Sequence, residues 1–176
     1  GLYTGATNAE ESGKSITFNS DGADLGASWS NVNTSGASYV AWNWKANGSG
    51  SSNTDGTITS TVSANTTAGV SIVSYTGTGS AATVGHGLSS APEALIVKSR
   101  DSTTAWRIWW TGFTGTERLQ FDTGAKATTN TSWDGTVPAA SVFSLGADSN
   151  TNNSGTDYIA YCFHSVEGYS KFGSYT

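Results

Sequence analysis

The sequence predicts an all-β protein, an antiparallel β-sandwich with a jelly-roll-like number of strands. Charged residues make up only 12% of the 176 residues, about half the usual share, while Gly, Ser, Thr and Asn are abundant. No stretch is rich enough in Ala, Leu, Glu and Lys to form a long helix. Instead, about ten short β-branched or aromatic segments are separated by turn residues, at a spacing typical of sandwiches.

Each expected strand is short and is bounded by turn residues. Glu93–Lys98 (EALIVK) is a continuous apolar run after Pro92, as expected for a strand covered on both faces. Thr57–Val62 (TITSTV) instead alternates with a polar face. The other expected strands, in chain order, are Ser15–Phe18, Tyr39–Lys45, Val70–Tyr75, Ala105–Trp110, Arg118–Phe121, Ser141–Leu145, Tyr158–Phe163 and Tyr169–Tyr175.

One strand of this set occurs twice. SGASYVAWNWKA (35–46) and SGTDYIAYCFHS (154–165) share Ser-Gly, Tyr, Ala and alternating bulky residues, at an offset of 158 − 39 = 119 residues. Such periodicity marks modular arrays. We therefore expect one sandwich domain over 1–176, built from an incomplete repeat (about 1–46), a linker or long loop (47–56) and a fuller repeat (about 57–176).

Long literal strings in the chain carry a resemblance. They are SNTDGTITSTVSANTTAGVSIVSYTGTGSAATVGHGL (Ser52–Leu88), AP-x-ALIVKSRD (Ala91–Asp101), VFSLG (Val142–Gly146) and YCF-x-x-VEGYSKFGSYT (Tyr161–Thr176). Over about residues 25–176 the sequence resembles repeat modules of tail-fibre and other virion-associated proteins of marine bacteriophages. The resemblance implies a structural role at a host-facing, extracellular virion surface, with other virion subunits as partners. It brings no assigned catalytic residues.

The chain departs from this pattern in two places. Asn43 stands where the resemblance leads us to expect a cysteine, and the first repeat lacks the central strands of the second. We therefore expect the first repeat to complete a neighbouring sandwich and not to fold alone. Because the chain starts at Gly1 in mid-pattern, we also expect it to be part of a longer protein.

Charge and hydropathy exclude several classes of partner. The net charge is −5 and the eight basic residues are scattered, whereas nucleic-acid binding needs clustered Lys and Arg. No apolar run approaches the ~18 residues of a membrane span. The single cysteine, Cys162, excludes an internal disulfide, and its position in a strand predicts a buried, inert thiol.

Catalytic patterns are absent from the sequence, so we expect no enzyme. Glycoside hydrolysis needs two carboxylates across a cleft. Glu10 and Glu11 are adjacent in a polar stretch, and no spacing requires the other acidic residues to converge. His86 and His164 are isolated and lack zinc-site spacing. A polysaccharide-degrading domain remains the weaker alternative.

Asp148-Ser-Asn150-Thr-Asn152 has the alternating oxygen ligands of a calcium loop. It lacks the glycine at position six and the acidic residue at position twelve of an EF-hand loop. An Asx-rich turn is the other interpretation, and we expect no cofactor.

Aromatic side chains sort into faces, because alternate residues of a strand point to opposite sides. In AWRIWW (105–110) we expect Trp106, Ile108 and Trp110 to face the core. Arg107 must reach water or an anion, which places Trp109 on the outer face beside it. By the same rule, the bulky residues of the repeated strand are expected in the core: Val40, Trp42 and Trp44 in the first copy, and Ile159, Tyr161 and Phe163 in the second.

Exposed Trp beside Asn, Asp or Arg suits sugar binding, since the ring stacks on a pyranose and the polar neighbours bond its hydroxyls. The predicted site comprises Trp29, Arg107, Trp109, Trp133 and Asp134. The expected function is a non-catalytic carbohydrate-binding or adhesion module that binds a polysaccharide or cell-surface glycan. Alternatively, the rings cover the core or lie in a homo-oligomer interface, and the module is a spacer, decoration or oligomerisation unit.

Overall fold

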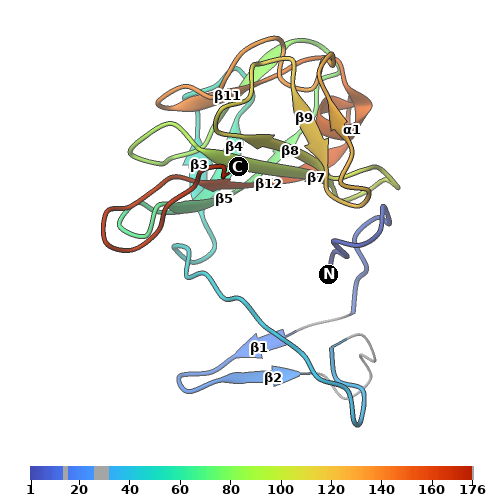
Figure 1. The fold of residues 1–176 in the computed structure, drawn as a ribbon, viewed down its shortest axis with the longest axis vertical. Coiled ribbons are helices and arrows are strands. Elements are labelled where there is room, and N and C mark those ends of the chain that lie inside the picture. The colour runs from blue at the N-terminus through green and yellow to red at the C-terminus, as the bar shows by residue number, and fades with distance from the viewer. Residues whose placement is uncertain (14–15, 26–31, 176) are drawn as a thin grey trace.

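The computed structural model describes residues 1–13, 16–25 and 32–175 and confirms the all-β sandwich (Figure 1). Its main sheet has eight strands in the order β10-β9-β8-β7-β12-β5-β4-β3, and every neighbouring pair is antiparallel. In chain order these strands are β3 (Ser51–Asn53), β4 (Ser60–Asn65), β5 (Val70–Thr76), β7 (Ala94–Ser99), β8 (Arg107–Trp110), β9 (Arg118–Gln120), β10 (Lys126–Ala127) and β12 (Asp157–Phe163).

The strand β12 lies at the centre of the main sheet. Ala160 pairs with Val73 of β5 on one side and with Val97 of β7 on the other. The core-facing residues Ala160 and Cys162 are fully buried. Because β5 and β7 touch only through β12, this strand joins the two halves of the sheet.

A smaller layer covers the core on one side of the main sheet. It consists of β6 (Ala82–Gly85) paired with β11 (Val142–Leu145), the one-turn helix α1 (Ser149–Asn152), and loops. Phe143 and Leu145 from this layer are buried in one cluster with β5, β7 and β12. The two layers of the sandwich are therefore unequal in size.

The prediction of which face packs in the main core was wrong for β8 and β12, although Trp106 and Ile108 are buried as expected, at 4% and 7% exposed. The main core cluster contains Trp109 and Tyr158, whereas Trp110 and Tyr161 lie on the opposite face and are only partly buried. That outer face is also apolar because the N-terminal segment 1–11 covers part of it. The indole Nε1 of Trp106, for example, donates to the carbonyls of residues 3 and 6 at 2.9 and 3.2 Å.

The first copy of the repeated strand, Tyr39–Lys45, was predicted as a strand with its rings in the core. It forms no strand in the described structure, and the side chains of Val40 and Trp42 are each 78% exposed. It follows a separate hairpin of β1 (Ile16–Phe18) and β2 (Ala23–Leu25). Figure 1 shows this blue-to-cyan part of the chain extending away from the main sheet.

Two other boundaries differ from expectation. The expected linker 47–56 contains β3, which is an edge strand paired with β4. The expected strand Tyr169–Tyr175 is replaced by an isolated bridge between Val166 and Ser170. The short strands β2, β3, β6 and β10 were not predicted.

Candidate functional site

The two described tryptophans of the predicted sugar site lie inside the protein. Trp133 is 1% exposed and Trp109 is 6% exposed, and both belong to the main core cluster. Their indole nitrogens donate to the backbone carbonyls of Glu117 at 3.1 Å and Thr114 at 3.2 Å. Neither ring offers a face to a ligand, so the expectation that they are exposed was wrong. Trp29 lies outside the described residues.

Arg107 also points inward, contrary to the prediction that it lies on the outer face, and the anion that it reaches is the carboxylate of Asp148. Its side chain is 8% exposed, its Nε lies 3.4 Å from Asp148 Oδ2, and its Nη1 donates to Gln120 Oε1 at 2.8 Å. Burial alone would raise the pKa of Asp148, but hydrogen bonds from Ser132 and Asn150 and the charge of Arg107 hold that pKa below its ordinary value. The pair is a buried, satisfied polar cluster and is not available to an anionic ligand.

Asp148 serves as a helix cap, which agrees with the Asx-turn interpretation of the proposed calcium loop. Its side chain accepts from the backbone N–H of Asn150 at 2.9 Å at the start of α1. Asn152 is fully buried and donates to the carbonyls of Ser80 and Gly146. Within residues 1–13, 16–25 and 32–175, no group of three or more His, Cys, Asp or Glu could hold a metal ion.

The remaining predicted residue, Asp134, lies in the turn after Trp133. It is exposed and has a left-handed backbone, with φ of 51°. Asx residues tolerate this conformation in turns. The structure thus brings Trp109 and Trp133 together in the core and leaves Asp134 as a turn residue outside it.

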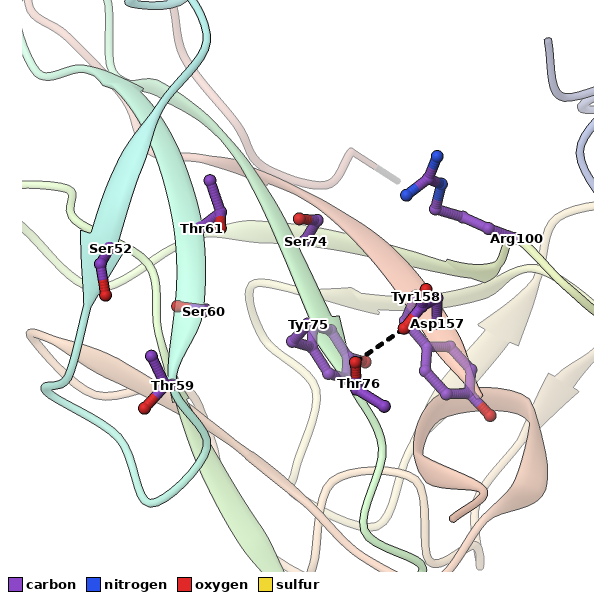
Figure 2. Close-up of a pocket in the computed structure, with 10 residues that line it drawn as sticks. All are labelled: Ser52, Thr59, Ser60, Thr61, Ser74, Tyr75, Thr76, Arg100, Asp157 and Tyr158. Atoms are coloured by element: carbon purple, nitrogen blue, oxygen red, sulfur yellow. Dashed lines mark hydrogen bonds between the residues drawn. The ribbon is translucent and has the colours of Figure 1, made fainter. Parts of the chain in front are cut away.

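A polar groove lies on the surface of β3, β4, β5 and β12 (Figure 2). It encloses about 260 Å³, and hydroxyl side chains supply most of its lining: Ser52, Thr59, Ser60, Thr61, Ser74 and Thr76. Figure 2 shows Thr76 bonded to Asp157, with a distance of 2.7 Å between Oγ1 and Oδ1. At the edge of the groove, Arg100 is already paired with Glu10, with its Nε 2.6 Å from Oε2.

The groove offers hydrogen bonds but no open aromatic face. Its two rings, Tyr75 and Tyr158, are 4% and 0% exposed and stack on each other with centroids 5.4 Å apart. Their hydroxyls donate to backbone carbonyls of α1 residues, Thr151 and Ser149, at 2.7 Å each. A sugar bound here would lack the stacking that usually provides affinity.

Most of the exposed large apolar side chains of the described residues lie in a different region, which we call the N-terminal arm (residues 16–25 and 32–46). They are Ile16, Phe18, Leu25, Tyr39, Val40, Trp42 and Trp44, from 36% to 78% exposed. Single exposed apolar residues are common, whereas a concentration of them on one segment suggests an interaction surface. The repeated sequence pattern lies in this arm, but its rings, which were predicted to be in a core, are exposed.

The C-terminal end of the N-terminal arm contacts the sandwich. The Trp44 ring packs edge-on against Phe163 of β12 with centroids 5.6 Å apart. The carbonyl of Lys45 accepts from Asn65 Nδ2 at 2.9 Å, and Asn47 N donates to Ser63 Oγ at 2.9 Å. From Val40 to Asn43 the structure shows no hydrogen bond to any described residue.

Comparison with known proteins gives a family but no named relative. No curated protein and no solved structure matches the chain. No helix in the described ranges has the length and apolar character needed to cross a membrane. The full length, residues 1–176, matches the family described as Domain of unknown function (DUF7483). The chain therefore belongs to the DUF7483 family.

Proposed function

We propose that the protein is a non-catalytic structural module of a virion fibre-type protein, which assembles with modules of its own kind through the N-terminal arm. The observation that carries the proposal is the exposure of Val40 and Trp42, at 78% each, together with that of Phe18, at 69%, in the same arm. The resemblance to phage virion repeats and the internal duplication of the sequence are consistent with this role.

The energetics favour covering the arm. An indole buries roughly 150–250 Å² when it is enclosed, so covering the exposed part of Trp42 would contribute about 4 kcal/mol at ~25 cal/mol per Å². Several such side chains lie on one stretch of backbone. The apolar side chains of this segment would therefore have a lower free energy against a protein surface than in water.

A carbohydrate-binding function is the second candidate, and the polar groove of Figure 2 favours it. Its hydroxyls and the Asp157 carboxylate match the hydrogen-bonding needs of a sugar. Binding there would depend on hydrogen bonds alone, since the Tyr75 and Tyr158 rings are buried. We rank it second because net hydrogen-bond contributions are small, about 1 kcal/mol each.

Sedimentation equilibrium across a dilution series, combined with a glycan-binding screen, tests the choice. We expect the protein to associate in a concentration-dependent manner, and the double variant Phe18→Ser/Trp42→Ser to associate more weakly. We expect the screen to yield no glycan whose affinity falls in the double groove variant Thr61→Val/Asp157→Asn. The groove variant is the matched control for association, because it changes a polar surface outside the arm. Association unchanged by the arm substitutions would refute the assembly role, and a glycan released by the groove substitutions would favour the lectin.

A further inference from the structure

We propose that Tyr39–Lys45, here called the arm strand, is the central strand of a second sheet of this same architecture. In that sheet it takes the position that β12 holds here, between a β5-type and a β7-type strand. The proposal rests on the arm-mediated assembly proposed above and adds a partner that an intact copy of this chain cannot replace: a module of this family that lacks its own β12. The register is set by the 119-residue offset between Tyr39 and Tyr158.

The turn that leads into β12 is already formed ahead of the arm strand. Asn153 N donates to the Tyr158 hydroxyl at 2.8 Å, and at the equivalent place Thr34 N donates to the Tyr39 hydroxyl at 3.0 Å. The two turns also share a backbone hydrogen bond of 3.2 Å, from Thr156 to Asn153 and from residue 37 to residue 34.

Both turns contain a glycine in the same left-handed conformation. Gly155 has φ of 73° and Gly36 has φ of 79°, a region that glycine adopts without steric cost. The local sequence thus forms the same turn before β12 and before the arm strand. After Gly155 the chain continues as a paired strand, whereas after Gly36 no strand pairing forms within the described structure.

Side-chain pattern matches the two faces of β12. Tyr158 and Ala160 face the core, are fully buried, and are identical to Tyr39 and Ala41. The outward-facing residues of β12 are only partly buried, and bulky residues also occupy the equivalent arm positions: Val40, Trp42 and Trp44 for Ile159, Tyr161 and Phe163. The arm strand therefore carries a residue of the right size at each of these positions.

Asn43 is the one position where the chemistry changes, since it stands where β12 has the buried Cys162. In the register of β12 this position lies opposite Ser71 and Leu95. The Ser71 hydroxyl is buried and lies against the Cys162 thiol, whose pKa burial raises and this hydroxyl lowers, but it makes no full hydrogen bond to a described residue. A buried amide needs a hydrogen-bond partner, so the receiving sheet is expected to present a hydroxyl or another polar group at the position of Ser71.

The side chains of the arm strand are ones that such a sheet would cover. Tyr39 is 47% exposed, whereas its equivalent Tyr158 is 0% exposed. Val40, Trp42 and Trp44 are 54–78% exposed, whereas the equivalent residues of β12 are partly buried. Strand addition would also pair the backbone groups from Val40 to Asn43 that have no partner in the described chain.

A tandem protein tests this inference. Residues 47–156, which lack β12, are placed before the intact chain 1–176. In the control tandem the added segment is 47–165 and carries its own β12. Hydrogen–deuterium exchange at the amides of the arm strand is the measurement. We expect exchange to slow by about 100-fold or more in the first tandem, and to remain as fast as in the single chain in the control.

Two substitutions give the test its specificity. Ala41→Arg should abolish the protection because the equivalent Ala160 is fully buried, whereas Val40→Arg should keep it because Ile159 is partly exposed. Non-specific apolar contact would show the reverse order. Fast exchange in the first tandem, or protection that survives Ala41→Arg, would overturn the proposal.

A second experiment is needed if the added segments fail to fold in both tandems. It transfers the arm-strand sequence into β12 of the single chain. In the single chain, Ile159→Val, Tyr161→Trp, Cys162→Asn and Phe163→Trp give β12 the arm sequence, and cooperative unfolding is expected to persist. Loss of cooperativity both with and without Cys162→Asn would overturn the inference. If the arm substitutions weaken self-association while the tandem shows no protection, the assembly function stands and the β12 position is wrong.

Discussion

Replacing Trp133 by Ala separates a structural role of this ring from a ligand-binding one. Trp133 is 1% exposed and packs in the main core cluster. Truncating a buried Trp costs about 3–5 kcal/mol, and the lost hydrogen bond to the Glu117 carbonyl adds about 1 kcal/mol. We therefore expect Trp133→Ala to lower the free energy of unfolding by about 4–6 kcal/mol, a large part of the 5–15 kcal/mol typical of a domain.

Urea unfolding followed by circular dichroism measures this loss. Tyr169→Ala is the control, since that ring is 66% exposed and lies outside the N-terminal arm, so its truncation should change the free energy by no more than about 0.5 kcal/mol. A loss below about 1 kcal/mol for Trp133→Ala would show that the ring is not held in the core, and it would return Trp133 to the list of candidate sugar-binding residues.

Two further predictions concern buried groups. Asp148→Asn should cost about 3 kcal/mol at neutral pH because it leaves Arg107 buried without its counter-charge. Because the folded pKa of Asp148 lies below its unfolded value of about 3.9, its stabilisation is present above that pH and is lost as the pH falls through the folded pKa. Urea titrations at neutral and acidic pH should therefore show a steeper acid loss in the parent than in Asp148→Asn, and equal slopes would contradict this. Cys162 is fully buried, and burial raises its pKa to about 12, so a thiol reagent should label it only at the rate of unfolding; rapid labelling of the folded protein would show that β12 opens locally.

The fold class followed from local sequence, whereas the assignment of faces did not. Alternating or continuous apolar segments between turn residues identified β5, β7, β8 and β12, because these patterns are properties of neighbouring residues. Which face is more buried depends on what covers it. The segment 1–11 covers the outer face of the sheet and hydrogen-bonds to Trp106 across about 100 residues of sequence. The sequence pattern of β8 itself contains no information about whether a distant segment covers its outer face.

The burial of Arg107 and Trp133 was missed for related reasons. Arg107 was expected outside because a charge rarely enters a core unpaired, but its partner Asp148 comes from a different part of the chain. Trp133 has polar sequence neighbours and yet is buried in the core. The strand β3 (SSN) has no β-branched or aromatic residue, so only its pairing with β4 makes it a strand. The repeat of this segment could be recognised from the sequence, but its exposure could be seen only in the structure.

The central place of β12 constrains the order of folding. Ribosomes deliver β12 after all the other strands, yet both halves of the main sheet need it as their common neighbour. During synthesis, the edges of β5 and β7 that pair with β12 therefore stay unpaired until residue 163 has emerged. The side chains of Val73 and Val97 next to them stay exposed for the same time. Such late, non-local closure slows folding and prolongs exposure to aggregation. A stalled or truncated nascent chain would thus present an open slot to any compatible strand nearby.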